Sequence, residues 1–276
     1  MKTAEIIGIS RHRILRDGDG VTTLVGINGC PFRCIYCINK EILCQSHQSQ
    51  KLSVDQLLKI VEIDDLYFRA TNGGITFGGG EPLLNAEFIK EFRSICPSHW
   101  KINIETTLNV HFRLLLDFDD LADNLIVDIK SLDSEIYNRY TGFNNNLLIS
   151  NLSELSKRHL QDKVLIRVPL IPNYNDKNDV YSSIKKLKDL GFHKYRIVRY
   201  IDNTYRNLRQ VTETEYGKGM CNILKHIRTI VAEANGVELK EYDCSKNKCR
   251  TGSCPKCEKE LSFLSSELNK LSEQII

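Results

Sequence analysis

The middle of the chain repeats one local pattern, a short β-branched run followed by a stretch with apolar residues at spacings of three and four. This alternation is typical of βα units that feed a parallel sheet, because parallel strands need a crossover helix between them. The six expected strands are Thr22–Ile27, Gly74–Phe77, Lys101–Glu105, Leu125–Ile129, Val164–Val168 and Tyr195–Val198. The helices expected between them are Val54–Ile63, Ala86–Cys96, Phe112–Asp120, Leu148–His159 and Val180–Leu190. The sequence therefore predicts an α/β fold.

The composition changes near the end of the chain. A helix is expected at Tyr216–Ala234 and a short strand at Val237–Leu239, after which residues 244–257 have almost no apolar side chains apart from cysteines. Such a segment has no core without a bound metal or cluster. We therefore expect a partial (β/α)6 TIM-like barrel over residues 1–240 and a cysteine-rich tail with a terminal helix over residues 241–276.

Charge and hydropathy exclude several classes of protein. The 38 Lys and Arg residues nearly balance the 35 Asp and Glu residues and are scattered, which gives no reason to expect a nucleic-acid partner. The N-terminus lacks the apolar core of a signal peptide, and no apolar run is long enough to span a bilayer. The sequence predicts a cytoplasmic protein with no membrane partner.

Cysteine is frequent, with ten residues in the chain. Cytosolic thiols are kept reduced, so clustered cysteines indicate metal or cluster binding instead of disulfides. Seven of them form two groups, which are Cys30, Cys34 and Cys37 near the start and Cys244, Cys249, Cys254 and Cys257 near the end. The remaining three, Cys44, Cys96 and Cys221, stand apart and are interpreted as ordinary buried or surface thiols.

The first group has the spacing C-x3-C-x2-C, which lets three thiolates on one loop hold a [4Fe–4S] cluster and leaves the fourth iron open. An open iron can bind a cofactor or substrate, as an open zinc site binds water. The alternatives are a zinc knuckle and chance spacing.

The residues around these cysteines carry a family resemblance. The loop from Cys30 to Asn39, with the aromatic Tyr36 before its last cysteine, resembles the cluster loop of radical S-adenosylmethionine (SAM) enzymes. Upstream, Asp17-Gly18-Asp19-Gly20 resembles the Asp-Gly-Pro-Gly entry of the glycyl-radical-enzyme activating enzymes, of which pyruvate formate-lyase activating enzyme is a member, with Asp19 in place of proline. The resemblance implies that Tyr36 and Asn39 lie against the cofactors.

A glycine-rich segment, Gly73 to Leu84, follows the second expected strand and resembles the activating-enzyme motif Gly-Gly-Val-Thr-x-Ser-Gly-Gly-Glu-Pro. Glycines there let the backbone approach a ligand closely. The resemblance implies that Gly79, Gly80 and Glu81 receive the SAM amino group, with Gly78 where the family has serine.

Polar residues also end later strands, where barrel enzymes collect their reacting groups. Glu105-Thr106-Thr107 resembles the family's Asp-Thr-Asn, and Asp128-Ile129-Lys130 its Asp-Leu-Lys. By resemblance, Lys130 would contact the SAM carboxylate, and Asp128, with Glu105 and Thr106, would hold a monovalent cation.

Arg167 begins a segment that follows the family's Arg-x-Pro-x-Ile-Pro pattern, which implies that its side chain projects into the barrel top as a cofactor contact. The alternative is an arginine paired with a nearby acid. After the sixth strand, Tyr200 is followed by Ile201 where the family often has histidine, so one SAM contact is missing.

The second cysteine group supplies four thiolates, enough to close a tetrahedral zinc site or an auxiliary [4Fe–4S] cluster. Spacing alone does not choose between these two, and unligated thiols are a third alternative.

The resemblance implies an anaerobic iron–sulfur oxidoreductase that cleaves SAM reductively to a 5′-deoxyadenosyl radical. The leading hypothesis is an activating enzyme that abstracts a hydrogen atom from a glycine of a partner glycyl-radical enzyme, with flavodoxin or ferredoxin as electron donor. One alternative is a radical SAM enzyme that modifies a small molecule or peptide and carries an auxiliary cluster. The other is a non-catalytic zinc-binding interaction protein.

Overall fold

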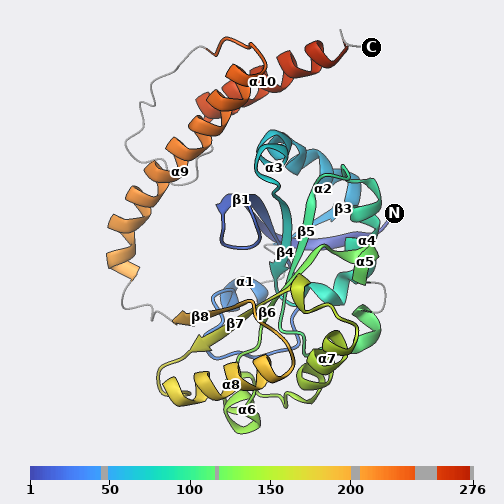
Figure 1. Cartoon of the computed structure of the whole chain (residues 1–276), viewed down its shortest axis with the longest axis vertical. Coiled ribbons are helices and arrows are strands. Elements are labelled where there is room, and N and C mark those ends of the chain that lie inside the picture. Colours follow the sequence, from blue (N-terminus) through green and yellow to red (C-terminus); the bar gives the residue numbers. More distant parts are fainter. Residues whose placement is uncertain (45–48, 116–117, 200–205, 240–253, 274–276) are drawn as a thin grey trace.

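A computed structural model describes residues 1–44, 49–115, 118–199, 206–239 and 254–273 (Figure 1). One eight-stranded sheet forms the centre of this described part, in the order β3-β1-β2-β4-β5-β6-β7-β8. The strands are β1 (Thr3–Ile14), β2 (Val21–Ile27), β3 (Gln50–Ser53), β4 (Gly74–Gly79), β5 (Lys101–Thr106), β6 (Asn124–Asp128), β7 (Val164–Leu170) and β8 (Tyr195–Arg199).

Six of these strands, β2 and β4 to β8, pair in parallel in chain order. They coincide with the six strands that the sequence predicts, within two residues at each end, so the α/β fold with a partial (β/α)6 sheet is confirmed. The sequence did not predict β1 and β3. Strand β1 pairs antiparallel with β2, and β3 pairs antiparallel with the other edge of β1.

Helices cover the sheet between successive parallel strands (Figure 1). The α-helices are α1 (Lys40–Cys44), α2 (Val54–Val61), α3 (Asp65–Thr71), α4 (Ala86–Ile95), α5 (Phe118–Leu121), α6 (Ser134–Thr141), α7 (Asn146–Lys157), α8 (Lys177–Asp189), α9 (Arg206–Ala234) and α10 (Pro255–Glu273). Short 3-10 turns include η2 (Glu62–Asp64), η3 (Pro82–Asn85), η4 (Phe112–Leu115) and η5 (Gln161–Lys163).

Several expected elements differ in type or extent. Where one helix was expected at Phe112–Asp120, the structure has η4 and the short α5, and the helix expected at Tyr216–Ala234 begins at Arg206. The helix expected at Val54–Ile63 ends at Val61 and continues through η2 into α3. The strand expected at Val237–Leu239 is wrong, because these residues have no regular secondary structure. Val237 and Leu239 instead pack against the hydrophobic cluster formed by α9 and α10, so burial explains their apolar character without strand pairing.

The main core lies between the sheet and its covering helices. Phe77 on β4 packs edge-on against Phe88 and Phe92 of α4, and Trp100 is fully buried beside Phe68. Such aromatic pairs add to the free energy gained from burial. This core fixes the strands so that the loops at their carboxyl ends are presented from a rigid frame.

The two long C-terminal helices form an arm along the outside of the barrel (Figure 1). Leu224 of α9 and Leu261 of α10 share a hydrophobic cluster with Tyr67 of α3 and Val21 at the start of β2. Within it the Arg228 guanidinium donates to Glu260 at 2.7 Å and to the Tyr67 hydroxyl at 2.5 Å. The division into a barrel over residues 1–240 and a tail over 241–276 stays a prediction.

Replacing Arg228 should destabilise the arm. Arg228→Met leaves the Glu260 carboxylate, whose side chain is 8% exposed, without its cation, and breaking a buried pair costs about 3–5 kcal/mol. Lys270→Met is the control, because Lys270 pairs with Glu267 at the surface with 63% of its side chain exposed, where pairs contribute about 1 kcal/mol or less. Urea unfolding measures both variants, and equal effects would contradict the importance of the buried pair.

Candidate cofactor site

The loop that carries Cys30, Cys34 and Cys37 follows the carboxyl end of β2 and rests on the end of α6. The backbone N–H of Arg33 donates to Thr141 O at 3.2 Å, and that of Ile35 donates to Tyr140 O at 3.1 Å. All three cysteines are partly exposed. The loop is therefore held by its backbone, which leaves the thiols available as ligands.

The glycine-rich turn after β4 lies directly beside this loop. Gly80 N–H donates to Ile27 O at 2.9 Å, and Glu81 N–H donates to Gly29 O at 2.8 Å. A Cβ on Gly80 would lie 2.2 Å from Gly29 O, and Gly79 has a φ of +95°. Glycine is thus required at both positions for the two loops to approach each other.

Asn39 joins the two loops through its side chain. Its Nδ2 donates to Gly79 O at 2.8 Å, which aligns the end of the cysteine loop with the glycine turn. The structure therefore gives Asn39 a definite role in positioning the expected SAM site, while its direct contact with a cofactor stays a prediction.

Glu81 is fully buried and is surrounded by donors. Thr106 Oγ1 and Thr107 Oγ1 each donate to its carboxylate at 2.7 Å, and Thr107 N–H donates at 2.9 Å. Burial raises the pKa of Glu81, and these donors partly offset the rise. The carboxylate thereby ties the glycine turn to the end of β5. Contact of Gly79, Gly80 and Glu81 with the SAM amino group stays a prediction.

Lys130 and Asp128 form a close pair after β6. Lys130 Nζ lies 2.5 Å from Asp128 Oδ2, and Lys130 adopts a positive φ of +57°. Burial opposes the lysine charge, but Asp128 outweighs it, so the pKa of Lys130 lies above its ordinary value. Both charges act on the Cys34 thiol, which places this pair beside the cysteine loop. Lys130 is thus a fixed cation close to where a carboxylate ligand is expected.

The three residues expected to hold a monovalent cation each contact another side chain, and the cation site stays a prediction. Thr106 donates to Glu81, Asp128 pairs with Lys130, and Glu105 Oε1 lies 2.6 Å from Arg167 Nη1. Thr106 and Glu105 thus contact side chains from other elements, whereas the Asp128 partner is only two residues along the chain.

Arg167, on β7, is the centre of an ionic network inside the barrel. Its Nη2 donates to Asp17 Oδ1 and to Arg16 O, both at 3.0 Å, besides the pair with Glu105. Asp17 lies in the turn between β1 and β2, so the network joins that turn to β5 and β7. Arg167 therefore pairs with acids, the alternative considered from sequence, and its contact with a cofactor stays a prediction.

Of the two carboxylates in this network, Glu105 has the raised pKa. Burial raises its pKa to about 7, although the nearby Arg167 charge opposes the rise. The pKa of Asp17 lies below its ordinary value, because hydrogen bonds and charge from Arg13 and Arg167 outweigh its burial. A larger residue at position 78 would crowd Glu105, because a Cβ on Gly78 would lie 2.9 Å from Glu105 Oε2.

Tyr36, beside the last loop cysteine, belongs to a small aromatic group. Its ring centroid lies 5.6 Å from that of Tyr174 and 6.2 Å from that of Tyr140, and its hydroxyl donates to Pro172 O at 3.4 Å. Tyr36 therefore links the cysteine loop to the segment after β7.

The thiols suit a positively charged group. Burial raises the pKa of Cys30 to about 11, and the charges of Glu81, Cys34 and Cys37 contribute to the rise. Burial raises the pKa of Cys34 too, which Lys130 offsets only in part. Thiolates here need a strong compensating cation, which iron provides. The donor set and the glycine turn therefore fit a [4Fe–4S] cluster with SAM beside it.

Tyr137 of α6 is a site residue that the sequence did not indicate. Its side chain is fully buried, and its hydroxyl makes no hydrogen bond of good geometry within the described part, although the Asn109 side chain is close. The charges of Cys34, Lys130 and Glu81 all act on this hydroxyl. A buried donor without a well-aligned acceptor is costly, so this hydroxyl is an unexpected polar group near the cysteine loop.

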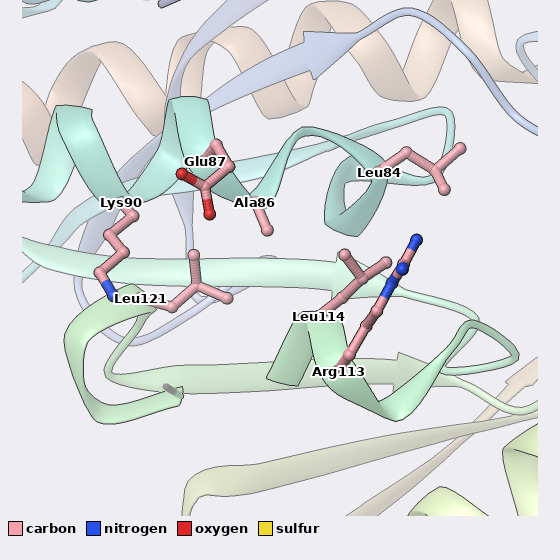
Figure 2. Close-up of a pocket in the computed structure, with 7 residues that line it drawn as sticks. All are labelled: Leu84, Ala86, Glu87, Lys90, Arg113, Leu114 and Leu121. Atoms are coloured by element: carbon pink, nitrogen blue, oxygen red, sulfur yellow. The ribbon is translucent and has the colours of Figure 1, made fainter. Parts of the chain in front are cut away.

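A surface pocket of about 100 Å³ lies away from this site, on the outside of the barrel. Figure 2 shows Glu87 and Lys90 of α4 facing Leu121 of α5 at one end of it, and Leu84 facing Arg113 of η4 at the other. A second hollow, of about 380 Å³, is lined by Lys101 and other residues near the amino ends of the strands. Neither is lined by the cysteine loop or the glycine turn, so we do not assign SAM to them.

The tail cysteines are described only in part. Cys244 and Cys249 lie outside the described residues. Cys254 and Cys257, at the start of α10, are both buried, and their sulfur atoms are 3.6 Å apart. Cys221 of α9, which the sequence suggested was an ordinary thiol, packs against this pair. Only the pairing of α9 with α10 reveals this, since 33 residues separate Cys221 from Cys254.

Removing the Asn39 side chain should weaken SAM binding. Asn39→Ala loses the bond to Gly79 O, and one hydrogen bond contributes about 0.5–1.5 kcal/mol, or roughly a 2- to 13-fold rise in Kd. Calorimetric titration of cluster-loaded protein measures this, with exposed Asn178→Ala on α8 as control. An unchanged Kd would show that the glycine turn does not need this tie.

The raised pKa of Glu105 predicts a pH dependence of stability. Between about pH 4.5 and 7 the folded chain holds the Glu105 proton more tightly than the unfolded chain, so the free energy of unfolding falls as pH rises. Glu105→Gln should remove this fall, by roughly 3 kcal/mol at most. Urea unfolding at several pH values measures it, with exposed Glu135→Gln as control. Parallel curves for wild type and Glu105→Gln would refute it.

The comparisons with known proteins agree with this geometry. The family model described as the radical SAM superfamily matches residues 24–184. The (2S)-3-sulfopropanediol dehydratase activating enzyme of Klebsiella oxytoca is 30% identical over 62% of this chain and 72% of its own. Pyruvate formate-lyase 1-activating enzyme of Escherichia coli (strain K12) is 28% identical over 59% of this chain and 66% of its own.

Fold similarity extends further along the chain. A solved structure of anSMEcpe with bound AdoMet has a TM-score of 0.50 and 19% identity, covering 76% of this chain and 59% of that one. Within the described residues, no helix is both long and apolar enough to cross a membrane. The family match, which includes the cysteine loop and the glycine turn, shows that the chain belongs to the radical SAM superfamily and is an enzyme of its activating-enzyme branch.

Proposed function

We propose that this enzyme abstracts a hydrogen atom from a backbone glycine of a partner enzyme and so leaves a glycyl radical on the partner. The names of its relatives support the proposal, since they are activating enzymes of a dehydratase and of pyruvate formate-lyase. The site observation that carries it is the joining of the cysteine loop to the glycine turn by Gly80 N–H and Glu81 N–H. This arrangement brings an open iron and a SAM pocket together.

The protein's own residues have separate tasks in this proposal. Cys30, Cys34 and Cys37 hold the cluster, and the glycine turn and Lys130 receive the amino and carboxylate groups of SAM. Cluster and SAM together supply the radical chemistry, with one electron from flavodoxin or ferredoxin. The products are methionine, 5′-deoxyadenosine and the glycyl radical, so the abstracted hydrogen ends on 5′-deoxyadenosine.

Exposed apolar side chains around the cysteine loop favour a protein substrate. Ile38 is 82% exposed, Ile35 is 48% exposed, and Phe143, which contacts Phe32 of the loop, is 39% exposed. Clustered exposed apolar side chains mark interaction surfaces. We propose that these residues contact the partner where its glycine enters the site.

An anaerobic assay tests the proposal directly. Reduced enzyme, SAM and a candidate glycyl-radical enzyme should yield methionine, 5′-deoxyadenosine and a glycyl radical signal in electron paramagnetic resonance. Ile38→Asp should lower the radical formed per 5′-deoxyadenosine severalfold, because a charge disrupts an apolar contact. Ile60→Asp, at a 40% exposed position on α2, is the matched control.

The outcomes separate the alternatives. Formation of 5′-deoxyadenosine without a radical on any glycyl-radical enzyme would reject the activating function and leave radical SAM chemistry intact. A mass change in a small molecule or peptide under the same conditions would then identify the other class of substrate. Equal effects of Ile38→Asp and Ile60→Asp would reject the docking role of the loop.

A further inference from the structure

We propose that Cys221, Cys254 and Cys257 are three ligands of one structural metal ion, a zinc-type mononuclear site, which joins α9 to α10. Cys254 and Cys257 are 7% and 8% exposed, and Cys221 packs against both. Cysteine is a strong zinc ligand, and three thiols gathered between two helices form a donor set suited to it. Cys221 is thus a metal ligand that sequence spacing does not reveal.

The spacing of the sulfur atoms favours one ion over a cluster. Two thiolates on the same tetrahedral zinc, each with a bond of about 2.3 Å, lie about 3.8 Å apart. The Cys254 and Cys257 thiols form a hydrogen bond with their sulfurs 3.6 Å apart, and this distance is also close to the value for two ligands of one ion. Cysteines of a [4Fe–4S] cluster bind different irons on separate corners, so their sulfurs are held farther apart than two ligands of one ion.

Metal binding requires some side-chain movement. Within the described ranges, no three His, Cys, Asp or Glu side chains are already arranged to hold an ion. This also applies to Cys30, Cys34 and Cys37. Cys221 packs against the closely spaced pair, so the proposal requires the three side chains to turn toward one another when the ion binds.

The location argues for a structural role. Tyr67 packs with Val21 at the start of β2. Its hydroxyl accepts a hydrogen bond from Arg228, and the charge of Cys257 contributes to its raised pKa. The SAM-site cysteine loop follows the other end of that strand, seven residues on, a separation of about 20 Å. Figure 1 shows α10 well apart from α1, which follows that loop. An ion here stabilises the arm and does not touch substrate.

Metal analysis of the whole chain tests the proposal. Protein purified anaerobically from cells supplied with iron and zinc should contain about one zinc besides the four irons of the SAM cluster. Cys221→Ser should lose the zinc and keep the iron. Cys96→Ser is the matched control. Cys96 is a buried thiol after α4, away from α9 and α10, and its Sγ contacts Arg93 O. The Cys96→Ser variant should keep both metals.

Cobalt substitution adds a readout that does not depend on activity. The thiolate-to-cobalt absorption of wild type should weaken in Cys221→Ser, and Cys221→His should restore binding with a shifted band, because histidine also binds this class of metal. Eight irons and no zinc in wild type would overturn the proposal, as would four irons and no zinc. Retention of zinc with an unchanged cobalt spectrum in Cys221→Ser would also overturn it. None of these results depends on glycyl radical formation.

Discussion

The close approach of two loops at the carboxyl ends of β2 and β4 is the constraint on which the candidate site depends. Parallel pairing brings Gly78 beside Gly26 and Gly79 beside Ile27, and the chain then continues the contact beyond the sheet through Gly80 and Glu81. A side chain on Gly80 would collide with the backbone of the cysteine loop. The glycines therefore set the position of the cysteine loop relative to the glycine turn.

Two sets of buried polar contacts then hold these loops to the sheet. Glu81 accepts hydrogen bonds from the end of β5, so the glycine turn cannot move independently of the sheet. Below it, Arg167 holds Glu105 and Asp17, which secures the β1–β2 turn inside the barrel. Buried polar groups of this kind stabilise a fold only when each has its partners, and Glu81, Asp17 and Arg167 all have theirs.

The contacts of the C-terminal arm are structural and lie away from the candidate SAM site. Helices α9 and α10 bury their apolar residues against α3 and the start of β2, and Arg228 joins Glu260 to Tyr67 across that interface. A metal held by Cys221, Cys254 and Cys257 would add a cross-link between α9 and the start of α10. The arm therefore packs against the start of β2, whereas the cysteine loop follows the end of the same strand.

The sequence by itself determined the six parallel strands, because each is an apolar run bounded by polar or glycine residues, and it determined the cysteine loop and the glycine turn, because their spacing is local. It did not predict β1, whose pairing partner β2 is known only from the sheet. Tertiary structure alone decided that Arg167 meets Glu105 and Asp17, that the expected cation donors Thr106 and Asp128 have other partners, and that Cys221 joins the tail cysteines. Apart from the local Asp128–Lys130 pair, these contacts join residues far apart in the chain, and only the packing of strands and helices brings such residues together.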